Sequence, residues 1–242
     1  MEIHETAVPD AYRVVPRHHT DARGSFFESY AYDELARRTG HVFVPLQVNY
    51  SVSARNTLRG LHGTRLPPGQ AKFVSCVRGA LLDVVVDLRL GSPAFGAYAT
   101  HRLDAREGTA VYVAEGLGHG FVALTDDACI SYLCSTRFVP GTQIDIQPLD
   151  PALGLPWHLG LTDEPLISEK DAGAPSLAEA ADQGLLATYD ACRELYERQL
   201  RAAGATGPAA PRSPAPPLVP APPPSPAVPS AQALAKASRT RR

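Results

Sequence analysis

The sequence predicts an all-β fold, an antiparallel sandwich or jelly roll, and three observations lead to this prediction. Many short runs rich in β-branched residues lie between residues 40 and 140, and Gly, Pro and Asp separate them. Helical patterns do not alternate with these runs, which argues against a doubly wound parallel sheet. The 242 residues are 44% hydrophobic and 20% charged, the balance of a folded globular protein rather than of a collagen or a coiled coil.

Eight strands are expected in this region, each a short apolar or β-branched run that ends at a turn residue. They are residues 43–51, 57–62, 71–77, 80–88, 97–103, 109–113, 120–124 and 129–135. Together they form the main domain, which we expect to span residues 1–175 and to bury a sizeable core.

The C-terminal part of the chain has a different composition. Ser176 and Glu179 form a capping-box pattern that opens a helix, expected to run to about Ala203 and to lie on the outside of the main domain. Eleven of the 23 prolines follow Gly204, mixed with Ala and Ser. Such a segment cannot bury enough apolar surface to order itself, so residues 204–242 are predicted to be a disordered tail.

Charge and cysteine usage limit the partners and the compartment. The net charge is −2, but all the charged residues of the tail are basic, which leaves residues 1–203 clearly acidic. An acidic domain is a poor general binder of nucleic acid. The four cysteines show no C-x-x-C pair, the N-terminus lacks a signal-peptide pattern, and no apolar run approaches membrane-spanning length. These features predict a cytoplasmic protein without a membrane partner.

Polar residues within the predicted strands can be sorted by face, because residues two apart point to the same side of a sheet. Gln47 and Asn49 share one face, and Lys72, His119 and Tyr132 each share a face with apolar residues. If such groups face inward, they form a polar pocket that requires a ligand, since unpaired buried polar groups are costly.

Two positions complicate this sorting. Arg59 and His62 have opposite parity, so a regular strand cannot direct both inward, but a bulge at Gly60 between them would. Tyr50 and Trp157, by contrast, are expected to be core residues rather than ligand contacts.

Six sequence motifs, in order, resemble those of the dTDP-4-dehydrorhamnose 3,5-epimerase family, and the resemblance covers about residues 10–177. They are LRGLH (58–62), PPGQAK (67–72), DVVVDLR (83–89), SPAFG (92–96), GHGF (118–121) and SEKD (168–171). The segments AEGLGHGF (114–121) and DPALGL (150–155) are more similar to those of the family members that make deoxysugars for secondary metabolites, such as antibiotics, than to those of the rhamnose branch.

This resemblance implies a cupin-like jelly-roll barrel, a homodimer, and neither a metal nor an organic cofactor. The implied substrate is a dTDP-4-keto-6-deoxyhexose, epimerised at C3, at C5 or at both. His62 would remove the proton next to the C4 ketone, with Asp171, helped by Asp83, orienting its imidazole. Lys72 would face the enolate oxygen, and Tyr132 would return a proton to the opposite face of the ring.

The resemblance also implies a set of substrate-binding residues, which hold the nucleotide and the sugar. Arg23 is expected to reach the site from the partner subunit, and Phe138 to stack on thymine. The full set is Arg23, Glu28, Gln47, Asn49, Arg59, His119, Phe138, Gln143 and Lys170. One departure from the family pattern is Gly63, which follows His62 where an aromatic residue is usual and could reshape the sugar pocket.

Other readings of these residues remain. Asp83 and Asp87 could form structural pairs with Arg78 and Arg89. A sugar-nucleotide 3,4-ketoisomerase would move a carbonyl instead of inverting a centre, and a non-catalytic protein would only bind the nucleotide sugar. A metal-dependent cupin oxygenase would need about three protein ligands, for which the sequence around His62 offers no H-x-H pair.

Overall fold

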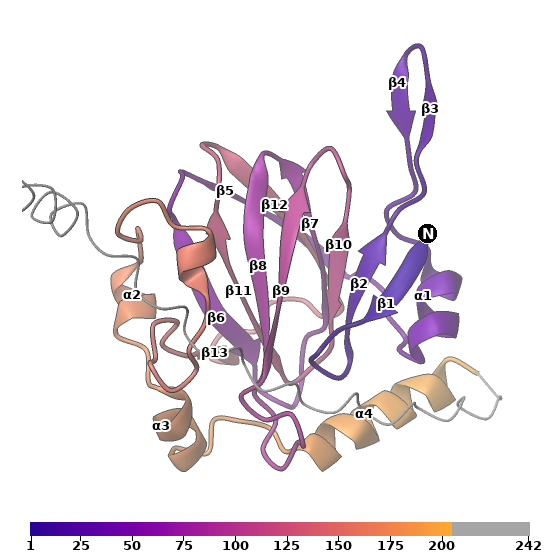
Figure 1. The fold of residues 1–242 in the computed structure, drawn as a ribbon. Coiled ribbons are helices and arrows are strands. Elements are labelled where there is room, and N and C mark those ends of the chain that lie inside the picture. The colour runs from indigo at the N-terminus through magenta and orange to yellow at the C-terminus, as the bar shows by residue number, and fades with distance from the viewer. Residues whose placement is uncertain (205–242) are drawn as a thin grey trace, which may run out of the picture.

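The computed structural model describes residues 1–204, which form two facing antiparallel sheets with helices at their edges (Figure 1). The larger sheet has the strand order β1-β2-β10-β7-β12-β5, and the smaller one the order β13-β6-β11-β8-β9. A separate hairpin, β3–β4, projects away from both sheets. The predicted antiparallel jelly-roll architecture is therefore confirmed. The predicted disordered tail lies, apart from Gly204, outside the described residues.

The strands are β1 (Glu2–Glu5), β2 (Ala11–Val15), β3 (His19–Asp21), β4 (Gly24–Phe26), β5 (Gln47–Ser53), β6 (Leu58–Thr64), β7 (Lys72–Arg78), β8 (Ala80–Asp87), β9 (Tyr98–Asp104), β10 (Ala110–Val113), β11 (Leu117–Ala123), β12 (Ala128–Cys134) and β13 (Gln143–Asp145). The helices are α1 (Tyr32–Thr39), the 3-10 turn η1 (Trp157–Leu159), α2 (Glu169–Ala172), α3 (Leu177–Asp182) and α4 (Tyr189–Ala202).

All eight predicted strands are present, with ends shifted by a few residues. The largest shift is in β5, which begins at Gln47 instead of residue 43. The prediction omitted α1, the strands before residue 30 and β13. Most of these strands are too short or too polar to give a clear two-residue alternation.

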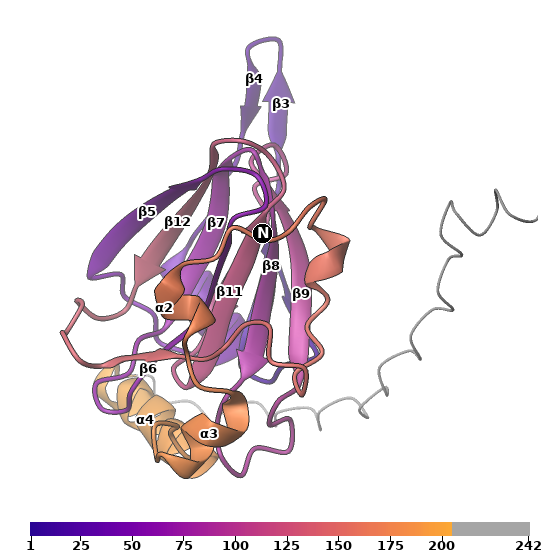
Figure 2. The ribbon, with the colours of Figure 1, turned by 90° about the vertical axis from the view of Figure 1, so that its left-hand side faces the viewer.

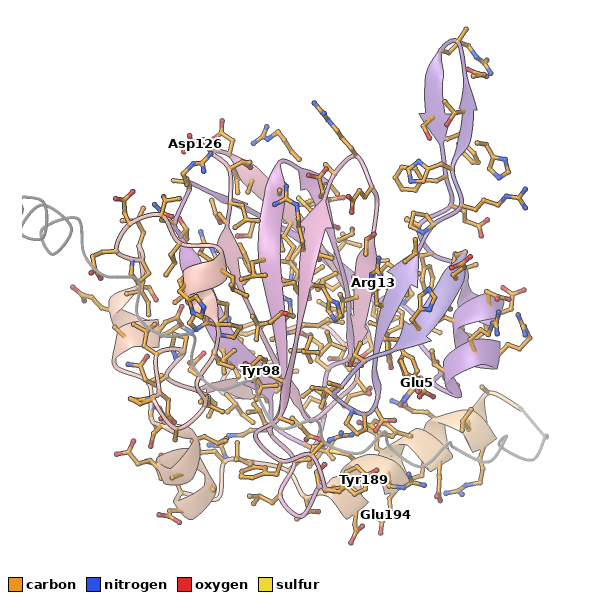
Figure 3. The ribbon with its side chains drawn as sticks, viewed as in Figure 1. Glu5, Arg13, Tyr98, Asp126, Tyr189 and Glu194 are labelled. Carbon is orange, nitrogen blue, oxygen red and sulfur yellow. The ribbon has the colours of Figure 1, made fainter. Side chains whose placement is uncertain are left out.

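β8 shows how the sheets divide the interior, because every one of its residues is buried. Leu81 and Val85 face the core between the two sheets, whereas Leu82, Val84 and Val86 belong to a second apolar cluster on the outer face of the smaller sheet. Residues from the C-terminal half, Trp157 among them, cover that outer face. Side chains fill the space between the sheets (Figure 3). α2 lies beside β6 at the edge of the smaller sheet (Figure 2), and α3 adds Leu177 and Ala180 to the outer cluster.

The C-terminal helix is two helices rather than one. The capping box of Ser176 and Glu179 opens α3 as expected, but α3 ends at Asp182 and α4 begins only after its N-cap, Thr188. Gly184 between them has φ +66°, a left-handed conformation that ends helices. The helices lie outside the barrel, as expected, and α4 buries Cys192 and Tyr196 against it. No helix within residues 1–204 is long and apolar enough to cross a membrane.

Candidate active site

A cavity of about 320 Å³ lies among strands of both sheets and is lined mainly by polar side chains. Nine of the residues singled out in the sequence line it: Gln47, Asn49, Arg59, His62, Lys72, His119, Tyr132, Phe138 and Gln143. The polar residues that the parity argument grouped by face thus meet at one cavity, on strands that are far apart in the sequence.

The predicted bulge at Gly60 is present and brings Arg59 and His62 to the same cavity. Across β6 and β11, His62 pairs with His119 and Arg59 pairs with Phe121, so two residues of β6 lie opposite Gly120 alone. Gly60 has φ +123°, and a Cβ there would lie 2.6 Å from the Cα of Gly120. Only glycine fits this close approach, which restores a common direction to Arg59 and His62.

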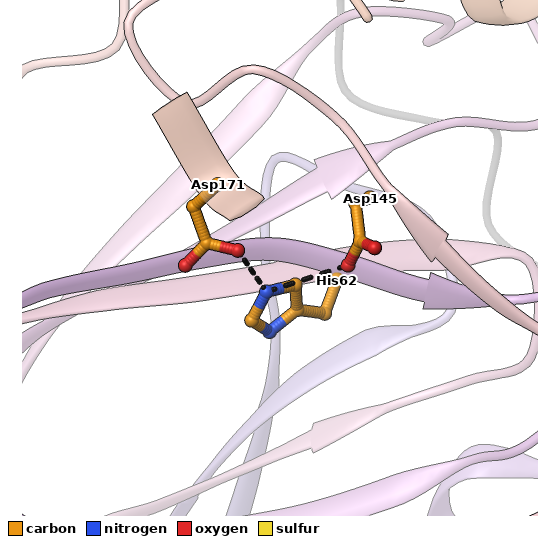
Figure 4. Close-up of side chains that lie close together, drawn as sticks. All are labelled: His62, Asp145 and Asp171. Carbon is orange, nitrogen blue, oxygen red and sulfur yellow. Dashed lines mark hydrogen bonds and ion pairs between the residues drawn. The ribbon is translucent and has the colours of Figure 1, made fainter. Parts of the chain in front are cut away.

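His62 is held by Asp171, as the sequence predicted. The distance from His62 Nε2 to Asp171 Oδ1 is 2.8 Å (Figure 4), and the other carboxylate oxygen accepts the backbone N–H of Gly60 at 3.4 Å. Ser168 caps the short helix α2 by accepting the backbone N–H of Asp171. The carboxylate is thus fixed from both sides, and it fixes the direction of the imidazole.

The surroundings of His62 favour the neutral imidazole. Burial lowers the pKa of His62, the hydrogen bond and charge of Asp171 raise it, and the charges of Lys72 and Lys170 lower it again, with a net effect below the ordinary value. Burial alone would raise the pKa of Asp171, but His62, the Gly60 N–H and Lys170 bring it below its ordinary value. A neutral imidazole beside a carboxylate anion is the form that accepts a proton.

Lys72 and Tyr132 supply the two other groups that the chemistry needs. Lys72 is half-buried, and its Nζ donates to the backbone carbonyl of His62 at 3.4 Å, which places the ammonium beside the base. Burial lowers the pKa of Lys72 and strongly raises the pKa of Tyr132. The phenol therefore keeps its proton at any working pH and can act as a proton donor.

Asp83 does not contact His62. Its Oδ2 lies 2.5 Å from Nε2 of His119, and the His119 ring stands edge-on to Tyr132 with 5.9 Å between ring centroids. The reason is the strand order, because β11 lies between β8, which carries Asp83, and β6, which carries His62. Asp83 therefore orients His119, while Asp87 forms the alternative structural pair with Arg89 at 2.7 Å.

Two predicted substrate-binding residues lie away from the cavity. Arg23 is at the tip of the β3–β4 hairpin, where its side chain is 90% exposed and pairs with Asp21, and Glu28 follows the hairpin on the surface (Figure 1). Neither lines the cavity of its own chain. Lys170 also does not line it, but its Nζ lies 2.8 Å from Asp145 Oδ1 and 3.6 Å from Asp171 Oδ1, beside the base.

Phe138 is 60% exposed at the cavity, and its backbone N–H donates to Oε1 of Gln47. Sequence reasoning missed Arg137 beside it, a cation that also lines the cavity. The expectation that Tyr50 is a core residue is wrong, because it is 66% exposed on the edge strand β5 and lines the cavity. Trp157 is buried, as expected.

Gly63 lines the cavity through its backbone, so its effect on the sugar pocket stays a prediction, but a side chain at this position would not itself enter the cavity. A Cβ at this position would contact the side chains of Leu88 and Ile144, which belong to the outer apolar cluster. Because neighbouring residues of a strand point to opposite faces, a side chain after His62 would point away from the cavity.

Among residues 1–204, one group could offer metal ligands, namely His62, Asp145 and Asp171, whose ligand atoms lie within 4.8 Å of one another. The Lys170 ammonium already pairs with both carboxylates. A second cation would have to displace it, so the group fits an oriented base better than a metal centre. Asp145 was not singled out in the sequence, because β13 is too short to show its face.

Comparisons with known proteins agree with this geometry. The sequence profile of the dTDP-4-dehydrorhamnose 3,5-epimerase family matches residues 5–179. A dTDP-4-dehydro-6-deoxyglucose 3-epimerase of Streptomyces bikiniensis is 46% identical over 81% of this chain and 100% of its own. A dTDP-4-dehydrorhamnose 3,5-epimerase of Mycolicibacterium smegmatis is 43% identical over 81% of this chain and 96% of its own.

Solved structures give the same result. The rmlC epimerase of Mycobacterium tuberculosis has a TM-score of 0.80 and 41% identity, covering 82% of this chain and 100% of that one. ChmJ of Streptomyces bikiniensis, a 3'-monoepimerase solved with dTDP-quinovose, has a TM-score of 0.77 and 46% identity, covering 81% and 98%. The chain belongs to the dTDP-4-dehydrorhamnose 3,5-epimerase family.

Proposed function

We propose that this protein epimerises a dTDP-4-keto-6-deoxyhexose at C3, at C5 or at both, in deoxysugar biosynthesis for secondary metabolism. The observation that supports this most directly is the His62–Asp171 pair at 2.8 Å on a cavity that Lys72 and Tyr132 also line. Relatives named for 3-epimerisation and for 3,5-epimerisation of such sugars support the same substrate class.

Each group has a distinct task in this reaction. A carbon next to a ketone is a weak acid, so neutral His62 removes its proton while the Lys72 ammonium stabilises the negative charge that develops on the C4 oxygen. Tyr132 then donates its proton to the opposite face of the carbon, which inverts the centre. Positioned proton transfer of this kind contributes about 10²- to 10⁴-fold to the rate.

The other cavity residues suit the rest of the substrate. Arg59 offers a planar, permanently charged group to a diphosphate, and Gln47, Asn49 and Gln143 offer amide groups to the sugar or the base. The exposed ring of Phe138 can stack on thymine. Lys170, outside the cavity lining, adds a positive charge near His62 through its pairs with Asp145 and Asp171. His119, oriented by Asp83, completes the wall next to Tyr132.

Deuterium exchange tests this proposal. Purified protein in D₂O, without added cofactor, is expected to incorporate deuterium into dTDP-4-keto-6-deoxyglucose, and His62→Ala is expected to abolish incorporation. NMR of the sugar shows whether C3, C5 or both exchange, which decides the regiochemistry. A product whose carbonyl has moved to C3 would identify a ketoisomerase, and nucleotide-sugar binding without exchange would identify a non-catalytic binding protein.

We also propose that the protein is a homodimer in which Arg23 enters the partner's site. The edge strand β5 exposes Val48 and Val52, each more than half accessible, an apolar surface of the kind that a second subunit covers. The β3–β4 hairpin extends away from both sheets (Figure 1), and Arg23 at its tip does not line the cavity of its own chain. Sedimentation equilibrium is expected to give twice the chain mass of 25.8 kDa, and a monomer at micromolar concentration would contradict this.

A cytoplasmic location fits the state of the thiols. All four cysteines are free, and three of them are buried. Free thiols are typical of a reducing compartment. Fractionation of the producing cells is expected to recover the protein with the cytoplasmic enzymes.

A further inference from the structure

A second carboxylate lies beside the proposed base. Asp145 is the cross-strand partner of His62 in the pairing of β13 with β6, and its Oδ1 lies 3.6 Å from His62 Nε2. Figure 4 shows Asp145 and Asp171 on either side of the same nitrogen of the imidazole. The short strand β13 thus brings a second negative charge to His62, in addition to the carboxylate of Asp171 that is hydrogen-bonded to the imidazole.

Asp145 is held in this position by its own partners. Its Oδ1 accepts from Gln143 Nε2 at 2.6 Å and from Lys170 Nζ at 2.8 Å. Its side chain is 25% exposed, so solvent does not compete freely for these contacts. Lys170 lies next to Asp171 on α2. The ion pair between Asp145 and Lys170 therefore joins β13 to α2.

Charged groups from several elements surround His62. Lys170 on α2 and Lys72 on β7 both disfavour a positive imidazole, whereas Asp171 favours it. His119 on β11 and Tyr132 on β12 also line the cavity, as does Arg59 from the same strand as His62. When His62 takes a proton it becomes a cation among these lysines. Both carboxylates pair with Lys170 Nζ, but Asp145 Oδ1 is the nearer, at 2.8 Å against 3.6 Å for Asp171 Oδ1.

We propose that Asp145 is a positioning residue for the base: it pairs with the Lys170 ammonium beside the imidazole and balances its charge, so that His62 can accept and keep a proton during turnover. This inference rests on the proposed function for its role in turnover, but its physical content is a property of the free protein. It assigns Asp145 and Lys170 to one charge-balanced unit with His62 and Asp171.

The test is an NMR titration of the His62 imidazole in the full-length protein without substrate, with the signal assigned by its loss in His62→Asn. Asp145→Asn keeps the shape and can still accept from Gln143 and Lys170, but it removes the charge. We expect the titration midpoint of His62 to fall by about one pH unit, the size of one uncompensated neighbouring charge. Asp33→Asn, on the exposed face of α1, is the matched control and is expected to leave the midpoint unchanged.

Lys170→Met tests the same balance from the other side. It is expected to raise the midpoint, and the double variant Asp145→Asn/Lys170→Met to return it close to the wild-type value. If Asp145→Asn unfolds the protein, the Lys170→Met shift alone decides the outcome, and an unchanged midpoint there overturns the proposal.

Activity provides a separate readout. The acid limb of the deuterium-exchange rate against pH is expected to move to lower pH in Asp145→Asn, together with a reduced plateau rate. A midpoint and a pH profile equal to those of Asp33→Asn would show that Asp145 has only a structural role. Wild-type protein that exchanges no deuterium would overturn the proposed function instead, while the titration without substrate would still test Asp145.

Discussion

Tyr132 separates proton removal from inversion at the scale of a single side chain. Burial raises the pKa of its phenol far above the working range, so the group is a donor and not a base. Tyr132→Phe is expected to retain deuterium exchange at the carbon that His62 serves, while epimer formation falls by about 10²-fold or more. Exchange and product formation can be followed in one NMR experiment, and an equal loss of both would show that Tyr132 also takes part in proton removal.

The pH dependence follows from His62. A base works when it is unprotonated, and burial keeps the pKa of His62 below the ordinary value of 6.5. Exchange should therefore persist below pH 6.5 and be lost only as the pH falls through the lowered pKa. Asp171→Asn removes a partner that raises this pKa, so its acid limb should lie lower still. Its plateau rate should drop about 10²-fold because the imidazole is no longer oriented. Initial exchange rates from pH 4.5 to 8 check both statements.

The residues that the sequence did and did not reveal differ in how they reach the cavity. Strand parity and motif order were sufficient for Lys72 and Tyr132, because each lies on a long, regular strand. They were not sufficient for Asp145, which lies on a three-residue strand, or for the partner of Asp83, which depends on strand order. Tyr50 was missed because propensity does not show which face of an edge strand remains uncovered.

At the scale of elements, a buried hydrogen bond helps to fix α4 to the barrel. Tyr196 donates from its hydroxyl to the backbone carbonyl of Glu115 at 2.5 Å, and Gln199 donates to the Glu115 side chain. Tyr196→Phe leaves that buried carbonyl without its donor, at a cost of about 1–3 kcal/mol in the free energy of unfolding. Thermal unfolding should show a melting temperature several degrees lower, with exchange activity at 25 °C unchanged. An unaltered melting temperature would mean that water replaces the hydroxyl.

Arg89 joins three elements at the other side of the same helix. Its buried guanidinium donates to Asp87 at the end of β8 and to Asp10 and the Pro9 carbonyl before β2. It lies 4.9 Å from the ring centroid of Tyr189, which Figure 3 labels. Arg89→Met leaves two buried carboxylates without their cation, which should cost about 3–5 kcal/mol. Urea unfolding measures this loss directly, and a loss below 1 kcal/mol would contradict it.

The same cluster gives the sign of a pH effect on stability. Burial alone would raise the pKa of Asp10, but His41 and Arg89 lower it well below the ordinary value of 3.8. A depressed folded-state pKa means that the contribution of Asp10 is complete above about pH 4 and is lost as the pH falls towards the folded value. Wild-type stability should therefore decline below pH 4, and less steeply in Asp10→Asn.

The helices and strands were predictable to the extent that they follow simple periods. The capping box at Ser176 located the start of α3, but the left-handed Gly184 and the second N-cap at Thr188 were not recognised as a break. Helical periodicity and propensity favoured one long helix. In the structure α3 packs on the outer apolar cluster and α4 packs on the core of the barrel, so the chain breaks between them.

At the scale of the whole molecule, the proposed dimer would supply residues that the cavity of one chain lacks. The base, the ammonium and the phenol line the cavity, whereas Arg23 at the tip of the β3–β4 hairpin and Glu28 just after it do not. An exposed hairpin bearing Phe26, 72% accessible, and a cation at its tip is suited to insertion into another subunit.

Hybrid dimers test this arrangement. His62→Ala lacks the base and Arg23→Gln lacks the cation offered to the partner, so each homodimer should exchange deuterium weakly or not at all. If Arg23 acts in the partner's site, a hybrid has one site with both defects and one intact site, formed by His62 of one chain and Arg23 of the other. Random mixing makes half of the dimers hybrids, so about a quarter of wild-type activity per site should return. If Arg23 acted in its own chain's site, each site of a hybrid would carry one defect and mixing would restore nothing.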